Sequence, residues 1–257
     1  MQLTILGSGT CAPRINRASA GILVQTNKTK ILFDCGTGTL NNLVQSGVDY
    51  KKIDLIFLSH LHTDHVANLF PLLHALNWTP DLKNKNHFFN RKGDLTIMGA
   101  PGFKKWFLDM QNLLPGTKPR PKTYKIKIKE SIKNSNFKEF KIETSKGNHS
   151  PFSLLSKFTT TNKKIFYSGD TDWDDNIINL GKNADLLILE CSWPDKYKES
   201  GHLTPIECGK IAYAAKAKKL LLTHFYPPTE KIDIKKIVSK YYNGPVIIAK
   251  DLMKINI

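Results

Sequence analysis

The chain has 257 residues, 40% of them hydrophobic and 10% aromatic, a composition that excludes a disordered protein and allows a sizeable buried core. Lysine and arginine outnumber aspartate and glutamate by 38 to 22. The resulting net charge of +16 favours polyanionic partners such as nucleic acid, although scattered lysines also fit an ordinary solvated surface. The four cysteines form no CxxC pair, which excludes a cysteine-based zinc ribbon and argues against a disulfide framework.

In the first half of the chain, short apolar runs predict strands and amphipathic segments predict helices. The expected strands cover residues 3–7, 20–26, 29–36, 52–60 and 95–102, and a hairpin at 27–30 joins the second to the third. The expected helices cover residues 39–47, 65–76 and 103–114, and Asp64 is placed to cap the second of them. The polar and basic segment 79–94 is expected to be an inserted loop.

In the second half, the basic segment 116–129 becomes strand-like where its residues begin to alternate. Strands are expected at residues 137–145, 151–160, 164–170, 184–191, 218–225 and 245–249, and helices at 175–181, at 204–217 and from about residue 232. Thr204, Pro205 and Glu207 form the capping-box pattern of a helix start.

The order of these elements predicts the architecture. Each half runs through strands and then a strand–loop–helix arrangement, which suits an α/β fold with two mixed sheets packed face to face and helices outside. No internal repeat and no shift in composition marks a boundary. We therefore expect a single domain over residues 1–257.

Three histidines and an aspartate lie close together in the segment LSHLHTDH, residues 58–65, of a chain with only 8 histidines. Imidazole is the commonest biological metal ligand, and a carboxylate often accompanies it. His60 and His62 are two positions apart and would point the same way from an extended segment, whereas Asp64 and His65 fall at the turn into a helix and diverge from them. The segment therefore predicts ligands for two cations.

Further side chains of metal-ligand type follow other apolar strands. His149, Asp170 and His224 stand there, as does Asp34, and a rigid strand fixes a ligand while the loop after it leaves the ligand exposed. Each cation needs roughly four ligands, so we expect the first three to complete the set. An aspartate suits a bridge because its two oxygens can bind different cations. Any one of these residues alone would be an ordinary surface histidine or helix cap, and the prediction depends on the joint pattern.

The motifs SHLHTDH, FDCGTG, NHS, SGDT, GHLT and LTHF carry a resemblance to the metallo-β-lactamase superfamily, and within it to the ribonuclease Z and related phosphodiesterase branch. The resemblance covers essentially the whole chain. It implies a four-layer αββα sandwich with two zinc ions at one edge, although the same ligands accept manganese or iron. The implied ligands of the first zinc are His60, His62 and His149, those of the second are Asp64, His65 and His224, and the bridge is Asp170.

The resemblance also implies catalytic roles. The histidine of GHLT, His202, would stabilise or protonate the leaving oxygen, and Asp64 would orient a metal-bridging hydroxide as well as bind metal. A histidine in a loop can serve as an acid near neutral pH, although a surface histidine is the plain alternative. Glu190 either orients His202 or is only a strand-end carboxylate. Cys35 is expected to be a small core residue.

One feature departs from the ribonuclease Z pattern. Those proteins generally carry a long arm between the NHS and GDT motifs that clamps transfer RNA, whereas only twenty residues separate His149 from Asp170 here. The segment leaves room for two strands and a turn. The basic stretches at 79–94 and around the KPRPK sequence are either RNA contacts or solvated loops.

These observations favour a phosphodiesterase that acts on RNA or on a small ester such as a cyclic nucleotide. Three alternatives stay open: a carboxyl-ester, lactone or thioester hydrolase, a 3′-end endoribonuclease of transfer RNA despite the missing arm, and a basic RNA-binding module without activity. The resemblance also implies a homodimer. The N-terminus has no basic region followed by a long apolar run, and no stretch approaches about 18 apolar residues, so we expect no leader, no membrane span and a cytoplasmic location.

Overall fold

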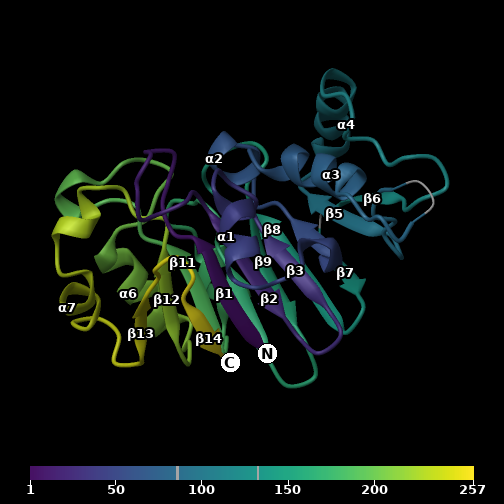
Figure 1. Ribbon diagram of the computed structural model, residues 1–257. Helices are drawn as coiled ribbons and strands as arrows, with labels where there is room; N and C mark the ends of the chain where they lie inside the picture. Colours follow the sequence, from purple (N-terminus) through teal and green to yellow (C-terminus); the bar gives the residue numbers. More distant parts are fainter. Residues whose placement is uncertain (85–86, 132) are drawn as a thin grey trace.

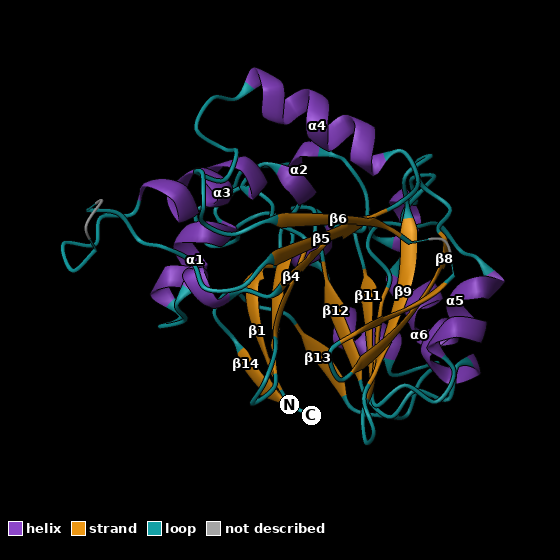
Figure 2. Ribbon diagram, turned by 90° about the vertical axis from the view of Figure 1, so that its right-hand side faces the viewer, coloured by secondary structure: helices purple, strands orange, loops and turns teal. Residues whose placement is uncertain are grey.

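Two mixed seven-stranded sheets pack face to face, with helices on both outer faces, in the computed structural model of the chain (Figures 1 and 2). The structure describes residues 1–84, 87–131 and 133–257. The strand order is β14-β1-β2-β3-β4-β5-β6 in one sheet and β13-β12-β11-β10-β9-β8-β7 in the other. This arrangement confirms the predicted four-layer α/β sandwich.

The first sheet is built from the N-terminal half of the chain and closed by the last strand. Its members are β1 (Gln2–Gly7), β2 (Gly21–Gln25), β3 (Lys30–Phe33), β4 (Leu55–Phe57), β5 (Leu95–Gly99), β6 (Ile126–Glu130) and β14 (Lys254–Asn256). The second sheet contains β7 (Asn134–Phe137), β8 (Phe140–Lys146), β9 (Leu154–Thr159), β10 (Lys164–Tyr167), β11 (Leu186–Glu190), β12 (Leu220–Thr223) and β13 (Val246–Ile248). Strands β3 to β6 are parallel, as are β10 to β13.

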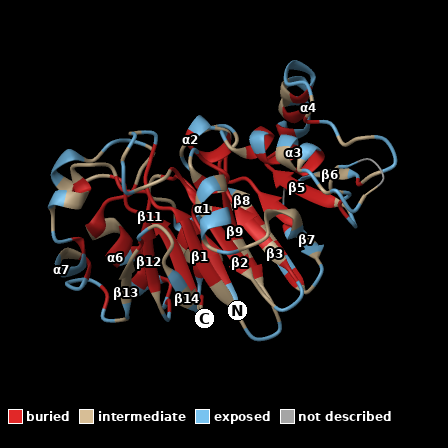
Figure 3. Cartoon of the chain, viewed as in Figure 1, coloured by how far each residue is buried: buried red, intermediate tan, exposed pale blue. Residues whose placement is uncertain are grey.

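The apolar strand sequences follow from burial on both faces. Along β3, Phe33 faces the space between the sheets, and Leu32 packs with the helices of the outer layer. Across the sandwich, the ring of Phe33 lies 4.6 Å from the ring of Phe158 and 5.4 Å from that of Tyr167. Figure 3 shows buried residues along the strands of both sheets, and they form two hydrophobic cores. These cores anchor the strand ends that carry the candidate site.

Helices cover each sheet on its outer side. The first sheet is covered by α1 (Thr39–Gln45), α2 (Thr63–Val66), α3 (Leu69–Trp78) and α4 (Phe103–Leu113), and the second by α5 (Asp175–Gly181), α6 (Pro205–Ala214) and α7 (Ile234–Val238). The capping box predicted at the start of α6 is confirmed, because Thr204 and Glu207 bond each other's backbone N–H groups.

Three details of the expected element pattern are wrong. The single helix over 65–76 is two helices, because Asn68 leaves the first helix to donate its backbone N–H to the Cys35 carbonyl. Asp64 lies in the first turn of α2, whose N-cap is His62. The single strand over 137–145 is a hairpin of β7 and β8, which turns at Lys138 with a φ of 50°.

Two other expectations are confirmed. In segment 79–94, the described residues form neither a helix nor a strand beyond one isolated bridge, which fits the predicted loop. Between the NHS and GDT motifs, the chain forms only β9, a turn and β10, so the expected pair of strands without an arm is present. Within the described part of the chain, no helix is both long and apolar enough to cross a membrane.

Candidate metal centre

The carboxyl ends of the parallel strands from both sheets meet at one edge of the sandwich. Asp34 follows β3, His60 follows β4 by three residues, Asp170 follows β10 by three, and His224 directly follows β12. Loops at this end of a parallel sheet are where ligand sites form, because the strand holds the backbone rigid up to the functional residue. The four strands therefore bring together residues that are up to 190 positions apart in the sequence.

Along the first segment of the site, the backbone passes from extended to helical at His62. This residue is extended, with a φ of −66° and a ψ of 148°, and α2 begins at the next residue. His60 and His62 therefore lie before the helix, whereas Asp64 and His65 belong to its single turn. The change in backbone direction gives each pair its own neighbours, as the sequence predicts. The rings of His60 and His65 nevertheless lie 4.0 Å apart, and these two residues form a further possible metal group with Asp170.

Each pair meets further donors from distant parts of the chain. His60, His62 and His149 form one group, in which a donor atom from each residue lies within 4.8 Å of those from the others. Asp64, His65 and His224 form a second group by the same measure. These two sets, referred to below as the first and second donor groups, have the same members as the two ligand sets proposed from the sequence.

Asp170 lies between the two donor groups. Its Oδ2 is 3.8 Å from Nε2 of His60 and 3.8 Å from Nε2 of His149. Its Oδ1 is 3.4 Å from Nε2 of His65 and 3.5 Å from Nδ1 of His224. Because each oxygen faces a different group, the carboxylate is placed as a bridging ligand has to be.

Two buried polar atoms in this cluster find no hydrogen-bond partner among the described residues. They are His60 Nε2 and Asp170 Oδ1. A buried polar atom without a partner is costly, and divalent cations bound to the two donor groups would supply a partner for each atom. Imidazole and carboxylate donors suit Zn²⁺, and they also accept Mn²⁺ or Fe²⁺. The residues therefore fit a divalent metal.

The charges of these groups also suit a metal. Burial, reinforced by the neighbouring His65, lowers the pKa of His60 well below its ordinary value, so its imidazole is neutral. Burial alone would raise the pKa of Asp170, but His224 and His65 outweigh it and hold that pKa well below the usual range. These two residues thus offer the deprotonated form that binds metal. Burial would lower the pKa of His65, but the negative charges of Asp170 and Asp34 outweigh it and raise that pKa well above its ordinary value, so a cation has to displace a proton from this ring.

A buried carboxylate fixes the orientation of His65. Asp34, which is fully buried, accepts a hydrogen bond of 2.7 Å from His65 Nδ1 and others from the Ser59 hydroxyl, the Ser59 backbone N–H and the Tyr167 hydroxyl. An ionised carboxylate only accepts, so the proton of His65 sits on Nδ1 and Nε2 is left to face the donor groups. Asp34 is therefore a support for a candidate ligand and lies outside both donor groups.

Nδ1 of two other candidate ligands also has a hydrogen-bond partner. Nδ1 of His149 donates to the Gly201 carbonyl over 2.9 Å, and Nδ1 of His224 lies 3.0 Å from the Ser192 hydroxyl. Such partners fix the tautomer and the ring plane, so the inward nitrogen is ready before any cation arrives. The serine partners carried no recognisable signal in the sequence.

His202 lies beside the two donor groups and is bonded to Glu190. Its Nδ1 is 3.0 Å from Glu190 Oε1, and the same nitrogen is 4.0 Å from Asp170 Oδ2. Burial would lower the pKa of His202, but the hydrogen bond to Glu190 and its negative charge outweigh burial and raise that pKa to about 9. Of the two readings left open for Glu190, the contact supports an orienting role.

A lysine that the sequence pattern did not single out braces the His202 loop. The ammonium of Lys198 donates to Asp172 over 2.8 Å, to Glu207 over 2.7 Å and to the backbone carbonyl of His202. Asp172 in turn accepts the backbone N–H of Gly201 over 2.8 Å. The partly buried ammonium of Lys198 thus connects the loop before His202 to the start of α6. This arrangement cannot be inferred from spacing, because its members are brought together only by the fold.

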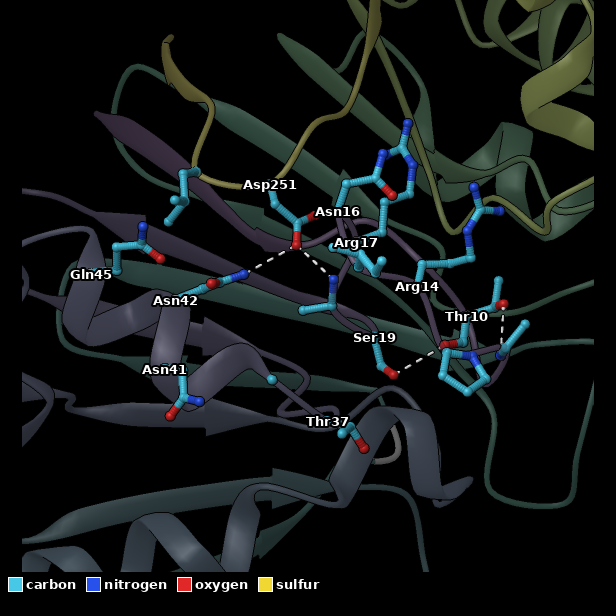
Figure 4. Close-up of a pocket in the computed structure, with 16 residues that line it drawn as sticks. Thr10, Arg14, Asn16, Arg17, Ser19, Thr37, Asn41, Asn42, Gln45 and Asp251 are labelled. Atoms are coloured by element: carbon cyan, nitrogen blue, oxygen red, sulfur yellow. Dashed lines mark hydrogen bonds between the residues drawn. The ribbon is translucent and has the colours of Figure 1, made fainter.

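A separate cavity of about 510 Å³ lies between residues 10–19 and α1 (Figure 4). Asn42 and the backbone N–H of Ala18 donate to Asp251 at its wall, and Ser19 donates to the Thr10 carbonyl. Its lining residues do not include the members of the donor groups.

The family model described as the beta-lactamase superfamily domain matches residues 29–225 of the chain. Among curated proteins, the probable metallo-hydrolase YhfI of Bacillus subtilis is 30% identical, and the match covers 97% of each chain. A ribonuclease Z of Archaeoglobus fulgidus is 27% identical over all of this chain and 97% of its own.

Solved structures agree on the fold. The crystal structure of YhfI from Bacillus subtilis superposes with a TM-score of 0.83 at 26% identity, covering 99% of this chain and 98% of the other. The short form of human tRNase Z superposes with a TM-score of 0.77 at 24% identity, covering 100% and 99%. The two sheets and their helices are therefore shared along the whole of these chains.

Proposed function

The chain belongs to the beta-lactamase superfamily, in its ribonuclease Z-like branch, and on this premise we propose that it hydrolyses phosphodiester bonds with two cations, zinc by preference. The chain is a metal-dependent hydrolase; we infer the number of its cations, the residues that bind them and the bond that it cleaves. The observation that carries this proposal is Asp170, whose two oxygens face different donor groups and whose Oδ1 has no other partner among the described residues.

The ligands in this proposal are the members of the two donor groups together with Asp170. Bound to them, a pair of zinc ions would supply Lewis acidity and lower the pKa of a water molecule held between them, which makes that water a nucleophile near neutral pH. Asp64 lies in the second group, 3.4 Å from Nε2 of His224, where its carboxylate can both bind a cation and orient the water. Asp34 holds His65 in the tautomer that the site needs.

His202 completes the proposed chemistry as the acid. His202 belongs to neither proposed ligand set, although its ring also lies near donor atoms of His149 and Asp170. In this role it donates a proton to the departing oxygen without leaving a cation short of a ligand. Glu190 keeps the ring oriented and favours its protonated form. An alkoxide leaving group profits most from such an acid, and this supports phosphodiesters over activated carboxyl esters as substrates.

Relatives named ribonuclease Z that match along their whole length support RNA as the substrate class. A short turn joins β9 to β10, so this segment has no arm that could clamp a transfer RNA. A substrate held mainly at the metal centre is therefore favoured. A dinucleotide, a short RNA and a cyclic nucleotide all meet this description.

A substrate panel with metal analysis of the same sample tests the proposal. We expect about two cations per chain and hydrolysis of bis(p-nitrophenyl) phosphate and of a short RNA that a chelator abolishes and added zinc restores. Turnover of a lactone without turnover of either phosphodiester would show a carboxyl-ester hydrolase instead. Tight RNA binding without turnover of any substrate would show a binding module.

Variants separate the assigned roles. His60→Ala should lower the metal content and the activity together, whereas His74→Ala, at an exposed position on α3, should change neither and serves as the matched control. His202→Ala should keep its metal and lose turnover of alkyl phosphodiesters. Loss of metal from the His202→Ala variant would contradict its role as an acid.

A further inference from the structure

Two aromatic side chains stack beside His202. The rings of Trp193 and Tyr226 are 4.7 Å apart at an angle of 22°, and both residues are only partly buried. They come from different loops, because Trp193 follows β11 by three residues and Tyr226 follows β12 by three. Neither belongs to the donor groups.

The pair is held in a fixed position. The backbone N–H of Tyr226 donates to the Ser192 carbonyl over 3.2 Å, and the backbone N–H of Ser192 donates to the Leu203 carbonyl over 3.1 Å. The Tyr226 hydroxyl lies 3.2 Å from Sγ of Cys11 on the loop that follows β1. Rigid aromatic surface of this kind binds a flat partner at a small cost in conformational entropy.

The position of the pair relative to the reaction determines what it could contact. The ring of Tyr226 is 6.1 Å from the ring of His202 and 6.2 Å from that of His224, with interplanar angles of 79° and 87°. His202 and His224 are themselves 6.0 Å apart and nearly parallel. The three rings thus surround one side of the metal centre, the side on which the proposed acid stands.

We propose that Trp193 and Tyr226 form a subsite for a nucleobase on the leaving-group side of the scissile phosphate. This inference rests on the proposed function, because it is His202 that marks the departing oxygen. In a nucleoside leaving group, a single sugar separates that oxygen from the base, so the base can reach the aromatic pair. The substrate class is then a phosphodiester whose departing alcohol is a sugar hydroxyl of a nucleoside, as in a dinucleotide or a short single strand. Stacking on aromatic side chains tolerates any base, so little sequence preference is expected.

The test compares two esters that differ only in the departing alcohol: a dinucleoside monophosphate, and the methyl ester of the nucleoside phosphate that its hydrolysis leaves as product. Both release an alkoxide, so the acid chemistry is matched. The esters differ in the departing nucleoside, and the Trp193 variants separate the contribution of its base from that of its sugar. We expect wild-type protein to prefer the dinucleotide in kcat/KM by roughly ten-fold, the size of one base–aromatic stack. Trp193→Ala should lower this ratio by about the same factor, and Trp193→Phe should restore most of it.

Two further variants make the result specific. Tyr226→Phe keeps the ring and should keep the preference, and Tyr213→Ala, an exposed tyrosine on α6, is the matched control. An unchanged ratio in Trp193→Ala, or no preference in the wild type, would overturn the subsite while leaving the phosphodiesterase intact. If the wild type with two cations bound hydrolyses neither ester, both the proposed function and the proposed subsite are wrong.

Discussion

Replacement of Asp34 by asparagine should weaken metal binding, although Asp34 touches no cation in the proposed scheme. One oxygen of this buried carboxylate accepts from His65, the Ser59 hydroxyl and Tyr167, and the other accepts from the backbone N–H of Ser59. An amide can supply only one accepting oxygen. If its NH₂ group faces Ser59 N–H, two donors oppose each other, and a buried group left unpaired costs about 1–3 kcal/mol of stability.

The other orientation of the amide affects the metal directly. With its NH₂ group towards His65, the ring can pair only through an unprotonated Nδ1, which moves the proton to Nε2, the atom that faces the donor groups. In either orientation the negative charge that supports His65 is lost, and loss of such a partner typically costs about 10- to 100-fold in metal affinity.

The assay is competition between the protein and a chromophoric chelator for zinc, with thermal unfolding of the metal-free protein measured in parallel. Asp185→Asn is the matched control, because Asp185 also bonds a backbone N–H, that of Lys164, but at the far end of β10. We expect Asp34→Asn to bind zinc at least ten-fold more weakly and Asp185→Asn to bind it as wild type. Equal zinc affinity in Asp34→Asn and wild type would refute the view that Asp34 sets the tautomer of His65.

Three other changes give separate tests. Asp170→Ala should lower the content of both cations together in native mass spectrometry, so two cations retained per chain would argue against a bridge. Lys198→Met leaves two carboxylates without their cation and should cost about 1–3 kcal/mol in denaturant unfolding. It should also lower kcat roughly ten-fold on alkyl esters but less on p-nitrophenyl esters, which need little help from an acid; equal losses would show that the brace does not act through His202. In thiol labelling at pH 8, exposed Cys11 should react in the native protein, whereas burial raises the pKa of Cys35 to about 12 and should keep it protonated and unreactive until the chain unfolds, so early labelling of Cys35 would contradict its burial.

The positions of the candidate ligands could be predicted because they depend on strands. His60, Asp170 and His224 each come shortly after an apolar run, and parallel strands carry such residues to one edge whatever the length of chain between them. The structure brings these side chains together, and their binding of metal stays a proposal. The fold class was predictable for the same reason, since strands buried on both faces leave a clear apolar pattern.

Features that depend on contacts between distant segments could not be predicted. The break between α2 and α3 arises because Asn68 bonds Cys35 and Leu40, which overrides a helical pattern that continues through it. Strand β14 has only three residues, and its pairing with β1 is not visible in so short a run. The Lys198 brace joins groups whose proximity exists only in the folded chain.

Glu190 links the proposed acid to the second donor group. This carboxylate is almost fully buried, and such a charge persists only where several donors compensate for the loss of water. Its donors are His202, the backbone N–H of Thr171 and the hydroxyl of Ser192, and that hydroxyl also contacts Nδ1 of His224. The group that would protonate the leaving oxygen and a group that would hold a cation therefore depend on one carboxylate. Because of this shared support, the orientation of the acid and the geometry of the second cation site are set together, before any substrate binds.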